Sequence, residues 1–327
     1  MSTPPFVDRP AGVDQVRVPA GRGDLAALVA APDRPPRDSA GAEGSPAVLV
    51  PGFTGSKEDF IAVLEPLAAG GHRVVALDLR GQFESPGDGD ATSYDVRSLA
   101  EDVLAVARSL GRPVHLLGHS FGGLVARAAA LADPAALRSL TIMGSGPAAV
   151  PHPAASNLQL IAQALPVMDL PTIWAAKREL ESQVEPVPPD PHIEEFLHRR
   201  FLSNDPVCLL RMAEQLLTET DRVDEVAALG LPTLSMWGPD DDTWPPALQA
   251  DMARRLGART AVVEGSGHSP AADRPVETSA ALLEFWAEVD ASGPRVDRTV
   301  SQATGSASPD HGSAGATAAD PAGQTRR

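Results

Sequence analysis

Short apolar runs alternate with stretches of helical periodicity along the first half of the chain. Mostly apolar runs lie at residues 47–50, 74–77 and 114–117, and each has the length of a buried strand. The apolar residues of the stretch 92–110 recur on one helix face, namely Val96, Leu99, Val103, Val106 and Leu110. Because strand and helix patterns alternate from about residue 45 to 145, we predict βαβ units and a mostly parallel sheet flanked by helices.

The pattern differs on both sides of this region. Before it, apolar runs at 13–18 and 25–30 predict a hairpin, and the Pro/Gly/Asp-rich stretch 31–45 predicts an exposed loop. From 147 to 230 only helical patterns occur, broken by prolines. The helices predicted there are 156–165, 170–183, 193–202, 207–218 and 223–229. Strands are also predicted at 140–143, 233–236 and 261–263, and helices are also predicted at 124–132, at 276–289 and after the capping-box-like pattern 56–59.

These patterns divide the chain into four parts. Residues 1–12 are predicted as a loose N-terminal arm, and 13–146 with 231–290 as the α/β core. Residues 147–230 form a helical insertion, which we expect to cap the loop end of the sheet. Residues 291–327 contain almost no large apolar side chains and are predicted to be a disordered tail, because such a segment cannot offset the entropy of ordering.

Composition narrows the class of protein. The chain has 327 residues, 43% of them apolar, and a net charge of −16, which disfavours nucleic acid and anionic membranes as partners. It has no apolar run near the roughly 18 residues of a transmembrane helix and no basic start followed by an apolar core. The single cysteine, Cys208, fits a reducing compartment, so we predict a cytoplasmic protein of undetermined oligomeric state.

The run 114–124, VHLLGHSFGGL, carries the strongest chemical signal. Gly118, Ser120 and Gly122 form a G-x-S-x-G between a predicted strand and a predicted helix. A serine on such a turn presents its hydroxyl above the sheet and at a helix N-terminus, and the flanking glycines allow the turn to be tight. This context predicts a nucleophile elbow with Ser120 as the nucleophile.

A serine nucleophile needs a base, and the base needs an orienting group. His268 lies on a glycine-rich loop after the last predicted strand, and Asp240-Asp241-Asp242 follow the strand at 233–236. The order Ser, Asp, His is the one found with this elbow. From position alone, any of the three aspartates could orient His268. We expect no cofactor and no metal site, since His115 and His119 do not share a helix face.

Together these residues resemble the α/β-hydrolase superfamily, in its branch of capped serine hydrolases. The acid segment of that family, W-G-x-x-D-x-x-x-P, matches Trp237 to Pro245 and selects Asp241, and its histidine loop matches residues 265–270. The resemblance implies an oxyanion hole formed by the backbone N–H groups of Phe53 and Phe121.

Two departures from the family pattern stand out. The oxyanion loop begins with Pro51 where the family usually has histidine. The segment 78–85, DLRGQFES, has Phe83 where the family pattern has its second glycine, which affects the expected loop shape. Neither change removes a group that the resemblance assigns to the chemistry.

The expected function is hydrolysis of carboxylic esters through an acyl-enzyme. Trp174 and Met168 of the insertion and Trp244 of the core are expected to line an apolar substrate pocket. The same triad also serves thioesterases, lactonases, C–C bond hydrolases and perhydrolases, which remain alternatives. A non-catalytic ligand-binding module on the same scaffold is a further, more remote alternative.

Overall fold

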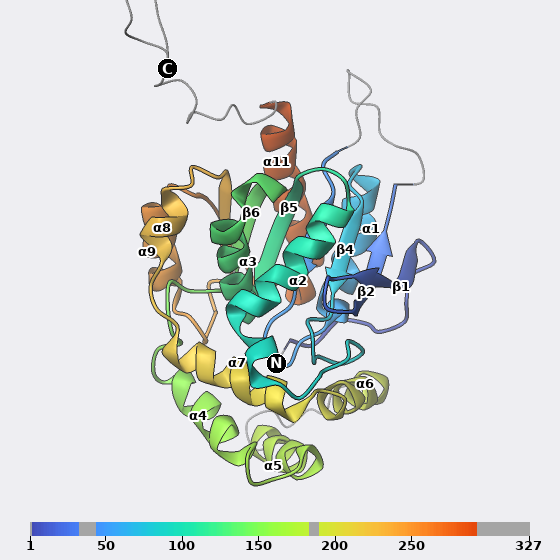
Figure 1. Ribbon diagram of the computed structural model, residues 1–327, viewed down its shortest axis with the longest axis vertical. Helices are drawn as coiled ribbons and strands as arrows, with labels where there is room; N and C mark the ends of the chain where they lie inside the picture. Colours follow the sequence, from blue (N-terminus) through green and yellow to red (C-terminus); the bar gives the residue numbers. More distant parts are fainter. Residues whose placement is uncertain (1, 33–43, 183–189, 293–327) are drawn as a thin grey trace, which may run out of the picture. The chain divides into compact units, whose positions relative to one another are not determined.

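The apolar runs of the sequence form one eight-stranded sheet in the described part of the chain (Figure 1). The structure is a computed structural model that describes residues 2–32, 44–182 and 190–292, which lie within one unit, Met1–Ser292. The strands are β1 (Val13–Pro19), β2 (Asp24–Ala30), β3 (Ala47–Val50), β4 (Val74–Leu77), β5 (Val114–His119), β6 (Leu137–Met143), β7 (Thr233–Trp237) and β8 (Arg259–Val262).

The strand order is β1-β2-β4-β3-β5-β6-β7-β8. Strand β2 runs antiparallel to β1 and to β4, whereas the neighbouring pairs from β4 to β8 are parallel. The predicted N-terminal hairpin and the predicted mostly parallel sheet are therefore confirmed. The central strands β3, β4 and β5 are buried along their whole length, as expected for a sheet covered on both faces.

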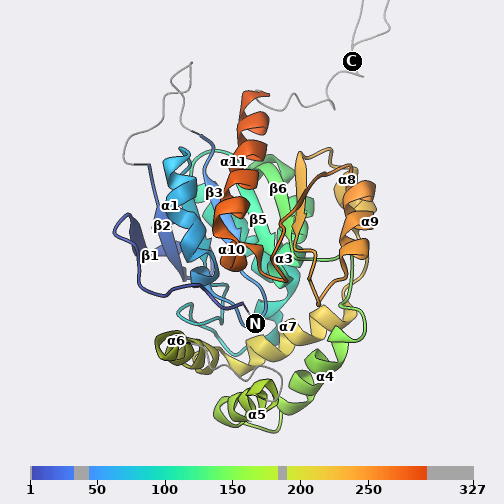
Figure 2. The ribbon, with the colours of Figure 1, turned by 180° about the vertical axis from the view of Figure 1, so that it is seen from behind.

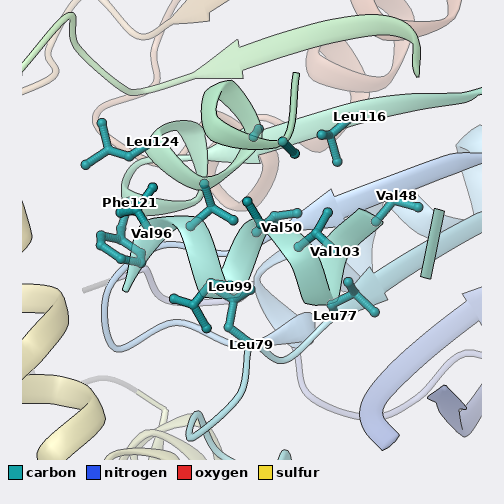
Figure 3. Packing of buried hydrophobic residues seen from close by; sticks show 14 of the residues in the cluster. Val48, Val50, Leu77, Leu79, Val96, Leu99, Val103, Leu116, Phe121 and Leu124 are labelled. Atoms are coloured by element: carbon teal, nitrogen blue, oxygen red, sulfur yellow. The ribbon is translucent and has the colours of Figure 1, made fainter. Parts of the chain in front are cut away.

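Helices cover both faces of the sheet (Figures 1 and 2). One face packs against α1 (Ile61–Ala69), α10 (Pro270–Asp273) and α11 (Pro275–Ala291). The other packs against α2 (Val96–Ser109), α3 (Phe121–Ala132), α8 (Val223–Ala227) and α9 (Pro246–Leu256). Figure 3 shows Val50 and Leu77 of the sheet meeting Leu99 and Val103 of α2 in this second layer.

Four further helices lie together beyond the carboxyl ends of the parallel strands (Figures 1 and 2). They are α4 (Ala154–Ala164), α5 (Leu170–Ser182), α6 (Pro191–Leu202) and α7 (Pro206–Thr218). Between β6 and β7 the described residues contain helices and no strand, as the sequence pattern predicts. The fifth helix of this stretch, α8, instead packs on the face of the sheet beside α3 and α9.

The predicted helix at 92–110 is interrupted. The structure has a short 3-10 helix, η2 (Ala91–Tyr94), and then α2, with extended backbone at Asp95 between them. The side chain of Gln215 on α7 joins the two pieces, because it accepts from Val96 N–H (2.6 Å) and donates to the Tyr94 carbonyl (2.9 Å). Backbone groups freed by the break are thus satisfied by a distant side chain, which the local pattern cannot indicate.

Helix α9 was not predicted, and two further 3-10 helices, η1 (Lys57–Phe60) and η3 (Pro134–Ala136), complete the described elements. Residues 2–12 contain neither helix nor strand. The predicted loop at 31–45 and the predicted tail lie largely outside the described residues, which omit 33–43 and 293–327. No helix among the described residues is both long and apolar enough to span a bilayer.

Candidate active site

Ser120 lies on a strained turn between β5 and α3. Its φ is +54° and its ψ is −119°, a conformation that a serine adopts only when the surrounding structure imposes it. A side chain added to Gly118 would overlap the backbone of Gly122, and one added to Gly122 would overlap the carbonyl of Val50. The glycines of the motif are therefore required by space, and the turn places Ser120 at the first turn of α3.

His268 connects Ser120 to Asp241. Its Nε2 lies 2.9 Å from Ser120 Oγ, and its Nδ1 lies 2.9 Å from Asp241 Oδ1. The three side chains come from the turn after β5, the loop after β7 and the loop after β8, all at the carboxyl edge of the sheet. The structure thus brings together the three residues that the sequence singled out as nucleophile, base and acid.

Asp241 is held by more groups than His268 alone. Its Oδ1 also accepts from the N–H of Thr243 (2.9 Å), and its Oδ2 accepts from the side-chain amide of Gln249 (2.8 Å). Burial alone raises the pKa of Asp241, but the hydrogen bond and charge of His268, with these two donors, lower it below the ordinary value. The carboxylate is therefore ionised at neutral pH.

Only one of the three consecutive aspartates reaches the histidine. Asp241 is 5% exposed, whereas Asp240 and Asp242 are exposed on either side of it. Gln249, which supports Asp241, lies on α9, the helix that the sequence pattern did not predict. The supporting residue was accordingly missed together with its helix.

The loop after β3 passes directly over Ser120. An added Cβ on Gly52 would lie 2.9 Å from the Cβ of Ser120, so this backbone is as close as a side-chain-free residue permits. The Gly52 carbonyl accepts from Gln82 Nε2 (2.9 Å) and from Gly55 N–H (3.1 Å). In a planar trans peptide, anchoring that carbonyl also directs the N–H of Phe53 to the opposite side.

His119 is a fourth side chain at this site and lies beside His268. Its Nε2 is 2.8 Å from the His268 carbonyl oxygen, which can only accept, so the imidazole donates. Burial and the neighbouring charge of His268 lower the pKa of His119 to about 3. His119 is therefore neutral, and its hydrogen bond supports the backbone of His268.

Phe83, at the position of the second glycine of the family pattern, has a left-handed backbone conformation. Its φ is +41°, in the left-handed region, where a bulky residue is strained by roughly 1–2 kcal/mol. Its ring packs edge-on against Phe196 of α6, with centroids 5.7 Å apart, and lies 4.6 Å from Lys57 Nζ. The substitution therefore exchanges backbone freedom for a contact between the core and α6.

Two fully buried cations near this loop are both paired. Lys57 Nζ lies 3.0 Å from Asp78 and 2.7 Å from Glu84. Arg200 of α6 donates to Asp59 at 2.7 Å, and thereby ties α6 to η1. Neither cation can receive an anionic ligand without losing a carboxylate partner.

The three residues expected to line a substrate pocket have different surroundings. Trp244 is fully buried, with its ring centroid 6.2 Å from that of His268. Trp174 is 7% exposed and packs against His198 and Phe201 within the helices beyond the sheet. Met168, between α4 and α5, is 50% exposed.

Comparisons with known proteins cover most of the chain. The model of the alpha/beta hydrolase family matches residues 47–281. RutD of Variovorax paradoxus, named for carbamate hydrolysis, is 27% identical over 267 residues, which are 77% of this chain and 95% of RutD. The pimeloyl-[acyl-carrier protein] methyl ester esterase of Aeromonas hydrophila is 33% identical over 223 residues, 64% of this chain and 83% of that protein. Among solved structures, a thermophilic esterase from Thermogutta terrifontis has a TM-score of 0.65 at 24% identity, and the match covers 84% of this chain and 99% of that one.

Proposed function

Because the chain belongs to the α/β-hydrolase family, as its motifs predict, and is a hydrolase, we propose that it cleaves carboxylic esters of small apolar substrates. The observation that carries this proposal is the position of His268 between Ser120 and Asp241 at 2.9 Å from each. Nucleophile, base and orienting acid within hydrogen-bond reach are the arrangement that acyl transfer requires.

The proposed reaction begins with attack of Ser120 Oγ on the ester carbonyl. His268 Nε2 takes the serine proton and later gives it to the leaving alcohol, and Asp241 keeps the remaining ring N–H in place. The developing oxyanion is held by the backbone N–H groups of Phe53 and Phe121. Phe121 is the first residue of α3, so its N–H has no acceptor within the helix. Water then cleaves the acyl-enzyme by the same steps.

The surroundings favour an apolar substrate. Phe53 packs against a buried apolar cluster formed by Phe83 of the core and by the helices beyond the sheet, so an acyl or alcohol group near Ser120 meets hydrocarbon on that side. The members of this cluster are Phe83, Leu165, Leu170, Ile173, Trp174, Phe196, Leu197, Phe201 and Leu209. We infer that α4 to α7 act as the cap, with this cluster as its underside.

The surroundings also favour a neutral substrate. Lys57 and Arg200, the buried cations near the loop, are already paired with carboxylates, so neither offers a site for a phosphate or carboxylate. The net charge of −16 acts in the same direction on anionic substrates. Acyl-CoA thioesters should therefore be poor substrates, although the Aeromonas relative is itself named for an ester attached to an acyl-carrier protein.

A substrate series tests this proposal. We expect kcat/KM for p-nitrophenyl esters to be highest for short and medium acyl chains, and to fall at least about tenfold for chains longer than decanoyl. Matching acyl-CoA substrates should be at least about tenfold poorer than the aryl esters. A preference for acyl-CoA would contradict the ester assignment and favour a thioesterase.

A covalent probe separates the proposed chemistry from the binding-module alternative. A fluorophosphonate should label wild-type protein at Ser120 and should not label the Ser120→Ala variant. Absence of labelling in a folded wild-type protein would mean that Ser120 is not an activated nucleophile.

A further inference from the structure

A second cluster of potential ligand atoms lies at the amino ends of the parallel strands, far from Ser120. His72 precedes β4, His115 is in β5, and Asp290 is in the last turn of α11. One ligand atom from each of the three lies within 4.8 Å of the other two. His72 is 4% exposed, His115 is fully buried and Asp290 is partly exposed, so the cluster lies at the edge of the interior with its two imidazoles buried.

In each of the two imidazoles, a hydrogen bond occupies the ring nitrogen Nδ1. His72 Nδ1 lies 2.9 Å from the carbonyl oxygen of Ser45, so it carries the proton and leaves Nε2 with the lone pair. His115 Nδ1 lies 2.7 Å from Ser139 Oγ, and His115 Nε2 is buried without a hydrogen-bond partner among the described residues. An oxygen partner on the second nitrogen is also the usual outer contact of a metal-binding histidine.

The carboxylate is held in a similar way. Asp290 Oδ2 accepts from Ser45 N–H (2.9 Å) and Oδ1 accepts from Ser45 Oγ (2.8 Å). Asp290 Oδ1 also accepts from Arg138 Nε (3.3 Å) and lies 3.4 Å from His115 Nε2, which is longer than a good hydrogen bond. An unsatisfied buried polar atom such as His115 Nε2 costs about 1–3 kcal/mol, so a ligand that bonded this nitrogen would be stabilised here.

We propose that His72, His115 and Asp290 bind one divalent transition-metal ion, of the Zn²⁺ or Co²⁺ class. Two imidazole nitrogens and one carboxylate oxygen are donors that these ions prefer, whereas Ca²⁺ and Mg²⁺ prefer oxygen throughout. The proposal revises the sequence-based expectation of no metal site, which considered His115 only together with His119.

The protonation states of the cluster suit a cation. Burial lowers the pKa of His115, and a neutral imidazole is the form that binds metal. Burial raises the pKa of Asp290, but the neighbouring His115 and the hydrogen bonds from Ser45 outweigh it and hold that pKa well below its ordinary value. The carboxylate is therefore ionised.

One charge in the cluster opposes the ion. Arg138 Nε lies 3.3 Å from Asp290 Oδ1, and its guanidinium would repel a second cation. The three ligand atoms, now within 4.8 Å of one another, must also move closer together when the ion binds. Zinc–nitrogen bonds of about 2.0–2.1 Å place tetrahedral donors roughly 3.4 Å apart. Removing the charge of Arg138 should therefore strengthen binding, which gives the proposal a readout opposite to that of the histidine variants.

The site is independent of the proposed hydrolysis. His115 and Ser120 are separated along β5 by roughly 16 Å, too far for a metal at one end to contact a substrate at the other. The ion would instead link the end of α11 to β5 and to the segment preceding β4. Its effect is expected on stability and not on kcat.

Titration of metal-stripped protein with Co²⁺ tests the site. We expect one Co²⁺ per chain, a visible d–d absorption, and quenching of the fluorescence of Trp286, whose ring is stacked on His115 with centroids 4.9 Å apart. Zn²⁺ should displace Co²⁺. His72→Gln and His115→Gln should each weaken Kd at least about tenfold, Arg138→Gln should strengthen it, and exposed His152→Gln should leave it unchanged.

The wild-type titration decides the proposal even if a variant is unstable. Absence of stoichiometric binding, or equal binding by His72→Gln and wild type, would overturn it. Ester hydrolysis in the same samples should change less than about twofold on metal addition. A loss of hydrolysis with normal Co²⁺ spectra would instead count against the proposed function alone.

Discussion

Two Ser–His–Asp groups lie near opposite ends of strand β5. At the carboxyl end, His268 contacts Ser120 through Nε2 and Asp241 through Nδ1, each at 2.9 Å. Ser120 has a positive φ, lies at the start of α3 and remains 7% exposed beneath the loop that carries Phe53. These are the features that the proposed role of Ser120 as nucleophile requires.

At the amino end the same residue types are arranged differently. His115 lies 2.7 Å from Ser139 through Nδ1 and 3.4 Å from Asp290 through Nε2, so the roles of the two ring nitrogens are exchanged. Ser139 is within β6, fully buried, and at no helix N-terminus. We therefore expect no hydrolysis at this second group, although a serine, a histidine and an aspartate are in contact there. The differences on which this expectation rests are the turn, the helix N-terminus and access to the serine.

The largest expected difference between the two groups is the effect of removing each serine. Ser120→Ala should reduce kcat by at least about a thousandfold, because triad members act as a unit. Ser139→Ala should change kcat less than about threefold, but should lower the free energy of unfolding by roughly 1–3 kcal/mol by leaving His115 Nδ1 unpaired. Ester kinetics and urea unfolding of both variants measure these effects. Equal losses of activity would invalidate the distinction.

The acid of the carboxyl-end group can be tested against its own neighbours. Asp241→Asn should lower kcat by about a thousandfold to ten-thousandfold, because an amide cannot orient the His268 N–H in the same way. Asp240→Asn and Asp242→Asn remove one charge each at exposed positions and serve as matched controls, with expected changes under about threefold. If a control variant is the impaired one, the assignment of the acid is wrong by one residue.

The turn that carries Ser120 and the position of Asp241 could be predicted from local sequence. The glycines around Ser120, the run of apolar residues before it and the periodicity after it all act within a few residues of one another. The motif around Asp241 likewise distinguishes it from two identical neighbours. Such signals exist because the tight turn and its flanking elements are determined by nearby side chains.

The supporting residues could not be predicted in this way. Gln82 contacts Gly52 across 30 positions, and Gln215 joins the broken helix across 119. Gln249 was missed with α9, although Pro246 at its start and Gly257, with φ +61°, at its end are ordinary helix boundary signals. A glutamine makes such contacts wherever the fold brings it, so its sequence position carries little information.

Gln82 tests whether the loop over Ser120 must be held in place. Gln82→Leu keeps the volume but removes the donor to the Gly52 carbonyl, so the N–H of Phe53 should lose its direction. Loss of one oxyanion donor costs about a hundredfold or more, and an indirect loss should be smaller, about tenfold to a hundredfold in kcat with KM little changed. Steady-state kinetics measure the split, and thermal unfolding confirms that the variant is folded. An increase in KM at constant kcat would show that Gln82 serves substrate binding instead.

The last expected effect is on stability and not on activity, and concerns pH and the second histidine of the carboxyl end. Burial lowers the pKa of His119 to about 3 in the folded protein, whereas an unfolded histidine titrates near ~6.5. Between these values the unfolded chain binds a proton that the folded chain does not, so the free energy of unfolding decreases as pH falls below ~6.5. The expected slope is about 1.4 kcal/mol per pH unit for this residue.

His119→Gln should remove that part of the acid sensitivity while retaining a donor for the His268 carbonyl. Between about pH 6 and 4, the loss of unfolding free energy in urea titrations should be about 2–3 kcal/mol smaller than in wild type. Exposed His152→Gln should keep the wild-type slope. An unchanged slope in His119→Gln would mean that His119 is protonated within the fold. That result would place a charge beside His268 and remove the contrast between a neutral supporting imidazole and the one that exchanges a proton with Ser120.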